Sequence, residues 1–206
     1  ALKLASRKGS SGNTMLSLNL SFRSVRKALS RVGIRGRCNL AALQRRLTFP
    51  QALLMALRRI RPADAFLLRE IFADAIESQA SGLYTPQQIR AWISLAWLPG
   101  VLDCVFQHGD GWISGDGAAF AMRQPQDRLA LLYCRGRASR QGHGAALVKR
   151  IECDARADGL VHIHAEASLL SLPLLERCGW RFLRLETFTV AGVPFEHHRM
   201  ERQLHN

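Results

Sequence analysis

The segment LALLYCRGRASRQGHGAALVKR, residues 129–150, decides the fold because it joins three kinds of element in one run. Its first part, Leu129 to Cys134, is a short apolar run that predicts a β-strand buried on both faces. A turn of small, polar and basic residues follows. Apolar residues then recur at helical spacing, at Leu147, Val148, Ile151 and Ala155. The segment therefore predicts a strand, a tight turn and an amphipathic helix.

The turn from Ser139 to Gly144 predicts an anion site. A helix that begins directly after a turn leaves several N–H groups unpaired at its N-terminus, where the helix dipole is positive. Gly142 and Gly144 carry no Cβ, so a ligand can approach the backbone closely. Phosphate or pyrophosphate is the ligand that suits such a site best.

This turn resembles the pyrophosphate loop of the GCN5-related N-acetyltransferases, which follows the pattern Arg/Gln-x-x-Gly-x-Gly/Ala after the fourth strand. Here the loop reads SRQGHG, with Ser139 in the first position. Downstream, VHIHAEASLLSLPLLERCGWRFL at residues 161–183 resembles the fifth strand, fourth helix and sixth strand of the family. The resemblance covers about 150 residues, from near Met55 to the C-terminus.

The resemblance implies an α/β fold with a mixed, mostly antiparallel central sheet, helices on both faces, and fourth and fifth strands that splay apart. It also implies N-acetyl transfer from acetyl-CoA to an amine of a small molecule or a peptide. The backbone of the fourth strand would bind the pantetheine arm, through Leu132, Tyr133 and Cys134. The turn would cradle the pyrophosphate, through Arg140, Gln141, Gly142, His143, Gly144 and Ala145.

Three positions depart from the family's pattern. Ala130 stands where relatives place an acid on the fourth strand, and Leu175 stands where many place the tyrosine that protonates the leaving thiolate. Leu170 replaces an asparagine that often contacts the cofactor. A catalytically degenerate CoA-binding regulatory protein of the same fold is therefore the alternative to an enzyme.

The predicted fifth strand offers substitute groups, because period-two alternation places His162, His164 and Glu166 on one face. A neutral histidine can take a proton from an ammonium through water, and a carboxylate can orient it or bind a cationic acceptor. His164 and Glu166 are thus the catalytic candidates, unless hydrogen bonds merely satisfy them. We expect no metal site, because three ligands in line on one strand rarely converge and the neighbours His197 and His198 point to opposite faces.

Two helices are predicted upstream of this region. Asp64 is placed to cap the first, and Thr85 with Gln88 forms a capping box for the second. In the family this helical pair and its loop form one wall of the acceptor site. The candidates for substrate contact are therefore Tyr84, Trp92 and Trp97, with simple packing on the sheet as the alternative.

The remaining elements are strands. Residues 57–61 predict a first strand, and residues 101–107 and 112–122 predict a hairpin around the turn HGDG. Gly115 and Gly117 lie inside the second of these runs and indicate a bulge or loose pairing. Residues 180–190 and 194–202 predict a closing hairpin.

Charge divides the chain into two parts. Residues 1–60 hold 13 of the 29 Lys and Arg residues and none of the 16 Asp and Glu residues, so the net charge of +13 lies there and the remainder is formally neutral. We divide the chain into a basic leader, 1–54, and an acetyltransferase domain, 55–206. The leader fits three interpretations: an overextended start, an organelle transit peptide or a nucleic-acid-binding arm. The first two predict disorder or weak helix before residue 50.

The five cysteines form an odd set without CxxC spacing, which indicates buried thiols in a reducing compartment. No apolar stretch approaches the ~18–20 residues that span a bilayer. We therefore expect a cytoplasmic protein, or an organellar one if the leader is a transit peptide. Its expected partners are acetyl-CoA and an amine, without nucleic acid, membrane or metal, and a homodimer is an option.

Overall fold

The computed structural model describes residues 56–204. The predictions for the leader, residues 1–54, and for Cys38 lie outside the described residues.

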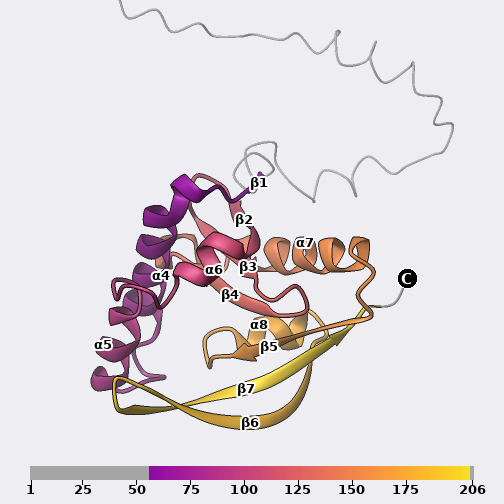
Figure 1. The fold of residues 1–206 in the computed structure, drawn as a ribbon. Helices are drawn as coiled ribbons and strands as arrows, with labels where there is room; N and C mark the ends of the chain where they lie inside the picture. The colour runs from indigo at the N-terminus through magenta and orange to yellow at the C-terminus, as the bar shows by residue number, and fades with distance from the viewer. Residues whose placement is uncertain (1–55, 205–206) are drawn as a thin grey trace, which may run out of the picture. The chain divides into compact units, whose positions relative to one another are not determined.

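An antiparallel sheet of four strands forms the first half of the fold (Figure 1). Its strands, in spatial order, are β1 (Leu57–Arg59), β2 (Asp110–Ser114), β3 (Ala119–Arg123) and β4 (Leu129–Cys134). Three helices cover one face: α4 (Ala65–Gln79), α5 (Pro86–Ser94) and α6 (Asp103–His108). The helix α7 (His143–Ala157) covers the other face. Helices on both faces confirm the predicted architecture.

A second sheet of three strands forms the other half. It has the order β5 (His162–Ala167), β7 (Val193–Gln203) and β6 (Arg181–Val190), with both pairs antiparallel. One face packs on α7 and on the short helix α8 (Leu172–Arg177), where Ile163, Met200 and Leu175 are almost fully buried. The opposite face lies toward α5, where Phe195 contacts Trp92.

The backbones of the two sheets join where the residue before β4 lies beside the middle of β5. A parallel bridge joins Arg128 to His164, and the His164 amide donates a hydrogen bond of 2.9 Å to the Asp127 carbonyl. Beyond this bridge the two strands belong to separate sheets, each as an edge strand. This separation is the splay that the resemblance implied.

The segment 129–150 forms the three predicted elements. Burial along β4 alternates, because Leu129 and Leu131 are buried whereas Ala130 and Leu132 are half-buried. The expectation that both faces of this strand are buried is therefore wrong for its second half, which faces a cavity.

Of the two predicted helix caps, one is confirmed. The Gln88 amide donates to Thr85 Oγ1 at 3.2 Å, and the Thr85 amide donates to Gln88 Oε1 at 3.0 Å. Asp64, by contrast, does not cap α4, because its carboxylate accepts from the Arg61 amide and the Arg58 guanidinium at 2.8 Å each. It closes a 3-10 turn, η1 (Pro62–Asp64), in front of the helix.

The hairpin predicted from residues 101–107 is wrong. Most of that run forms α6, because Leu102 and Phe106, four residues apart, share one buried face. The true hairpin pairs β2 with β3, and Gly115 and Gly117 lie in its turn with positive φ rather than in a bulge. The closing hairpin of β6 and β7 is confirmed.

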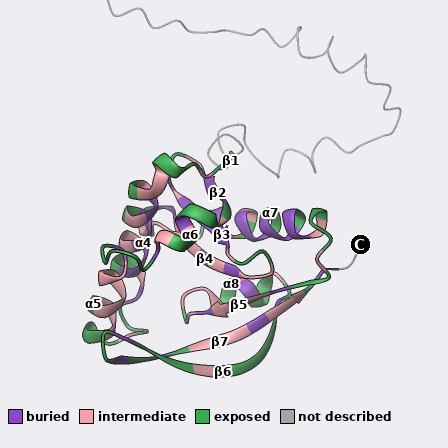
Figure 2. Cartoon of the chain, viewed as in Figure 1, coloured by how far each residue is buried: buried purple, intermediate pink, exposed green. Residues whose placement is uncertain are grey.

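Exposure differs sharply between the strands (Figure 2). β3 is buried throughout, whereas β6 is an edge strand with large apolar side chains on the surface. Cys134 and Cys178 are half-buried, but Cys104 and Cys153 are exposed, so the expectation of buried thiols fails for these two. No helix within residues 56–204 has both the length and the apolar character needed to cross a membrane.

A glycine inside β2 generates a stability prediction. A Cβ at Gly111 would lie 2.4 Å from the Ala121 carbonyl oxygen, so Gly111→Ala must push β3 away and should cost about 1–3 kcal/mol of unfolding free energy. At Gly144 a Cβ would meet only the flexible end of Leu174, at 2.7 Å, so Gly144→Ala should cost much less. Urea denaturation measures both, and equal losses would contradict the prediction.

Candidate active site

A cavity of about 320 Å³ opens where β4 and β5 separate. Its walls come from both sheets, from α5 and α8, and from the loop before each of these helices. The lining residues are Tyr84, Trp92, Leu95, Arg128, Leu129, Ala130, Leu132, Tyr133, Ala165, Glu166, Ala167, Ser168, Ser171, Leu175, Phe188, Val190, Phe195, Glu196 and His197.

The edge of β4 presents free backbone groups to this opening. The Arg135 amide donates to the Ala118 carbonyl of the neighbouring chain segment at 2.9 Å. Because an antiparallel ladder alternates, Leu132 and Cys134 then direct their N–H and C=O groups away from β3. The side chain of Gln79 already donates to the Cys134 carbonyl at 2.7 Å. The Leu132 amide and carbonyl and the Cys134 amide are therefore left for a ligand.

Tyr133 differs from its two neighbours. The same alternation turns its backbone toward Phe120 of β3, and its ring packs against Phe72 in a tilted arrangement with centroids 4.4 Å apart. Burial raises the pKa of the Tyr133 phenol far above its ordinary value and raises the pKa of the Cys134 thiol to about 11. Both groups are therefore neutral near pH 7, so Cys134 supplies no thiolate.

A β-bulge shapes the floor of the cavity. Met122 faces Leu131 and Arg123 faces Leu129, so Ala130 is an extra residue on β4. Ala130 and Leu175 both line the cavity, which places the two apolar departures from the family's pattern directly at the site. Neither side chain can move a proton.

The predicted substrate-contact residues separate into two groups. Tyr84 and Trp92 line the cavity, and their rings meet edge to face with centroids 5.2 Å apart. Tyr84 Oη also accepts a hydrogen bond of 2.9 Å from the Leu169 amide, which ties the loop before α5 to the loop before α8. Trp97 lies outside the cavity, against Phe66, and is 51% exposed.

The N-terminus of α7 has the geometry expected for an anion site. Gly142 is the N-cap residue, with φ of 95°, and no side chain caps the helix. The first helical bond runs from the Ala146 amide to the Gly142 carbonyl, so the amides of His143, Gly144 and Ala145 have no partner within the helix. Arg140 and Gln141 are exposed beside them.

The side chain of His143 does not face this loop surface. It is 3% exposed, and its Nδ1 lies 2.9 Å from Ser114 Oγ. Burial lowers the pKa of the imidazole. Only the backbone of His143 is therefore available to a phosphate, whereas the side chain anchors α7 to β2.

His164 and Glu166 lie on one face of β5, as predicted, but in different surroundings. Glu166 lines the cavity, where Arg128 Nε donates to its Oε2 at 2.6 Å and Arg199 Nη1 donates to its Oε1. His164 is not among the lining residues, and its Nε2 lies 4.0 Å from Glu166 Oε1. Burial, reinforced by Arg199, lowers the pKa of His164.

A second histidine enters the cavity from β7. His197 Nε2 lies 2.7 Å from Glu186 Oε2 on the paired strand β6, and the ring stacks on Phe188. This hydrogen bond lowers the pKa of the Glu186 carboxyl. Because Nε2–H donates this hydrogen bond to Glu186, Nδ1 is the unprotonated nitrogen and can serve as a base. Sequence reasoning missed this pair, since the two residues meet only through the register of β6 and β7.

Within residues 56–204, no group of three or more His, Cys, Asp or Glu side chains is arranged to hold a metal ion. His198 lies on the opposite face of β7 from His197, beside Phe182.

Two histidines with lowered pKa values, His143 and His164, generate a prediction about pH. Burial lowers the pKa values of His143 and His164 from the usual 6.5, so below about pH 6.5 the unfolded chain binds more protons than the folded chain. The free energy of unfolding should therefore fall as the pH drops from about 7 to about 5. His143→Gln should make this fall shallower in urea denaturation, whereas His162→Gln, which removes an exposed histidine, serves as the control. An unchanged slope in His143→Gln would contradict the assignment.

The structure was compared with known proteins. No family model and no curated protein matches the sequence. A GCN5-related N-acetyltransferase from Rhodopseudomonas palustris is similar in structure, with a TM-score of 0.69 and 23% identity over 73% of this chain and 96% of that chain.

Two further structures agree with this likeness. The PaiA N-acetyltransferase of Thermoplasma acidophilum, solved in complex with coenzyme A, has a TM-score of 0.55 and 14% identity over 72% of this chain and 99% of that one. An N-acetyltransferase from Staphylococcus aureus has a TM-score of 0.51 and 20% identity over 73% and 98%. Residues 56–204 therefore have the fold of the GCN5-related N-acetyltransferases.

Proposed function

We propose that the protein is an acetyl-CoA-dependent N-acetyltransferase. The observation that carries this proposal is the free edge of β4, which runs from the cavity toward the N-terminus of α7. A ligand with an acyl group, a hydrogen-bonding arm and a pyrophosphate matches the cavity, the strand edge and the helix N-terminus in that order. Similar proteins of the same fold include one solved with coenzyme A.

The residues present fit such a ligand. The pantetheine arm can take the place of the missing partner strand, because its amides can form hydrogen bonds with the Leu132 amide and carbonyl. The amides of Gly144 and Ala145, with the positive end of the helix dipole, can bind the pyrophosphate. Arg140 and Gln141 add exposed donors beside them. These are mostly backbone contacts, so they survive the side-chain departures from the family's pattern.

We assign the proton transfer to His197. The acceptor enters as an ammonium and must lose a proton before its nitrogen can attack the thioester carbonyl. His197 Nδ1 takes this proton and passes it to solvent, while Glu186 holds the ring and stabilises the imidazolium. The attack forms the C–N bond, collapse breaks the C–S bond, and the second proton of the nitrogen ends on the CoA sulfur.

With His197 as the base, the two catalytic candidates on β5, His164 and Glu166, have other roles. Both carboxylate oxygens of Glu166 already accept hydrogen bonds from guanidinium groups, and His164 Nε2 lies 4.0 Å from Glu166 without lining the cavity. We therefore propose that Glu166 positions Arg128 rather than acting as the base. The alternative function, a degenerate CoA-binding protein, is favoured by Ala130 and Leu175, which bring no proton-transfer group to the cavity.

A charge placed at the helix N-terminus tests CoA binding. Ala145 is exposed in the first turn of α7, where a glutamate stabilises a helix. Ala145→Glu should therefore fold normally but repel the pyrophosphate, and should weaken acetyl-CoA binding by about tenfold or more in calorimetric titration. Ala145→Gln is the neutral control. Equal affinities for both variants would remove the loop from the CoA site.

Replacement of the base tests turnover. His197→Gln should lower kcat by roughly 10²–10⁴-fold in an assay of CoA thiol release, with acetyl-CoA affinity unchanged. Glu186→Gln should lower kcat less and shift the acidic limb of the pH profile, because it acts through His197. His198→Gln, on the opposite face of β7, is the matched control. Tight acetyl-CoA binding without thiol release by the unaltered protein would instead establish the degenerate alternative.

A further inference from the structure

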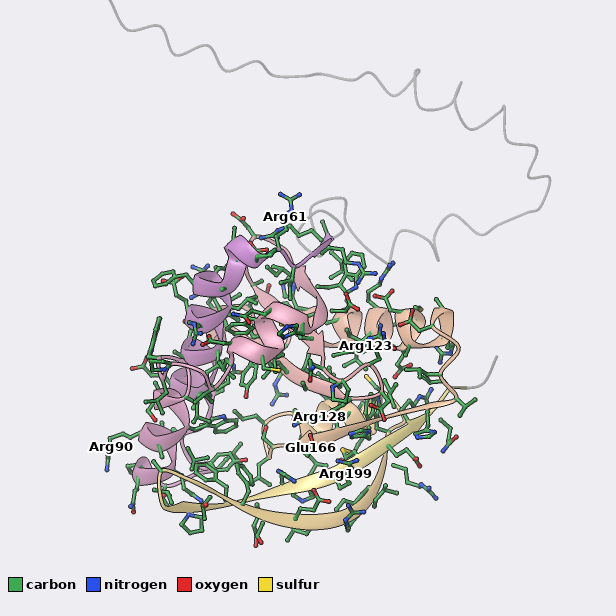
Figure 3. All side chains as sticks on the ribbon, viewed as in Figure 1. Arg61, Arg90, Arg123, Arg128, Glu166 and Arg199 are labelled. Carbon is green, nitrogen blue, oxygen red and sulfur yellow. The ribbon has the colours of Figure 1, made fainter. Side chains whose placement is uncertain are left out.

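Three charged residues meet where β4 and β5 separate. Glu166 gives one carboxylate oxygen to Arg128 and the other to Arg199, so the cluster holds one positive charge in excess (Figure 3). Arg128 and Glu166 line the cavity, and the Glu166 side chain is only 15% exposed. An excess cation at a partly desolvated site favours an anionic ligand.

Arg128 is held by its Nε atom, which leaves its two terminal guanidinium nitrogens free to bind a ligand. It contacts Glu166 side-on through Nε, and no described residue bonds either of its terminal nitrogens. Its backbone is fixed as well, since its amide donates to the Pro125 carbonyl and its carbonyl accepts from the Gln124 amide. The two terminal nitrogens of a guanidinium match the two oxygens of a carboxylate, and here they are positioned in advance.

The rest of the cavity complements an amine with an apolar body. Trp92, Leu95, Phe188 and Phe195 form an apolar wall. His197 lies two residues from Arg199 on the same face of β7, a separation of about 7 Å along a strand. A base and a guanidinium cluster at this spacing can contact an amino and a carboxylate group only a few bonds apart.

We propose that the acceptor is a free amino acid with an apolar side chain, and that Arg128 binds its carboxylate. This inference rests on the proposed acetyl transfer and chooses between the small-molecule and peptide acceptors left open by the sequence. A peptide N-terminus has no carboxylate at that distance, and a cavity of about 320 Å³ is near the small end of ligand sites, about 300–1,000 Å³.

The test compares acceptors that differ only in the carboxylate. The full chain, saturated with acetyl-CoA, is assayed for thiol release with leucine, leucinamide, phenylalanine and phenylalaninamide. We expect kcat/KM for each acid to exceed that for its amide by roughly 10- to 100-fold, the range of a lost charge-assisted contact. The comparison is stringent because the amides have the less basic amino groups, so a larger fraction of them is unprotonated and ready to attack near pH 7.

Variants of Arg128 test whether this residue binds the carboxylate of the acceptor. Arg128→Gln should raise KM for leucine by roughly 10- to 100-fold and lower kcat/KM for leucinamide much less, so that the preference for the acid over the amide is lost. Arg128→Lys keeps a cation beside Glu166, so it preserves the fold if the glutamine variant is unstable, and it should lose part of the preference with the guanidinium fork. Arg90→Gln is the control, because Arg90 projects from α5 away from the cavity (Figure 3).

The possible outcomes distinguish a wrong acceptor assignment from a wrong assignment of acetyl transfer. Acetylation of amides as fast as acids, or an unchanged preference in both Arg128 variants, would overturn the carboxylate assignment and leave acetyl transfer intact. Thiol release with none of the four acceptors would overturn the amino-acid acceptor, and the proposed acetyl transfer would fall with it only if the same sample also bound no acetyl-CoA in calorimetric titration. Preference for the acids, abolished in Arg128→Gln but retained in Arg90→Gln, would establish the assignment.

Discussion

The separation of β4 from β5 is the constraint on which the rest of the structure depends. Two neighbouring parallel strands would normally bond along their whole length, but here they bond only at the bridge from Arg128 to His164. Backbone groups that lose their partner must be satisfied elsewhere. Gln79 supplies one substitute, at the Cys134 carbonyl. The remainder of the edge is open, and the cavity, the bulge at Ala130 and the turn before α7 are all arranged around it.

A cluster of charged residues joins the two sheets at the end where β4 and β5 are still paired. Glu166 links Arg128 at the start of β4 to Arg199 on β7, so one carboxylate ties the two sheets together. Breaking such a partly buried cluster is costly, because each partner left behind is an uncompensated charge. The same residues that fix the angle between the sheets therefore also set the electrostatic character of the cavity, which couples the fold to the choice of ligand.

Local patterns account for what could be predicted. Strand, turn and helix in residues 129–150 follow from short-range periodicity and glycine placement, and the capping box at Thr85 is a motif of four residues. The run at 101–107 is too short for its period to distinguish strand from helix, which is why α6 was missed.

The chemistry of the site depends on long-range pairing. Arg128 is a single basic residue in a turn, and its importance appears only when Glu166 is brought beside it. The pair of His197 and Glu186 depends on the register of two strands that contains an irregularity further along, between Phe182 and Arg184. His143, predicted among the residues that cradle the pyrophosphate, turns its side chain inward because Ser114, 29 residues earlier, offers a partner. Neither spacing nor composition carries such information.

The position of β6 has an evolutionary consequence. This outermost strand has only one neighbour, yet it contributes Phe188, 40% exposed, to the cavity wall. A substitution there can reshape the pocket without disturbing the cores that lie under β3 and α7. For the proposed acetyltransferase, substitutions on this single peripheral strand can thus change the acceptor over evolution, while the proposed cofactor path along β4 stays the same.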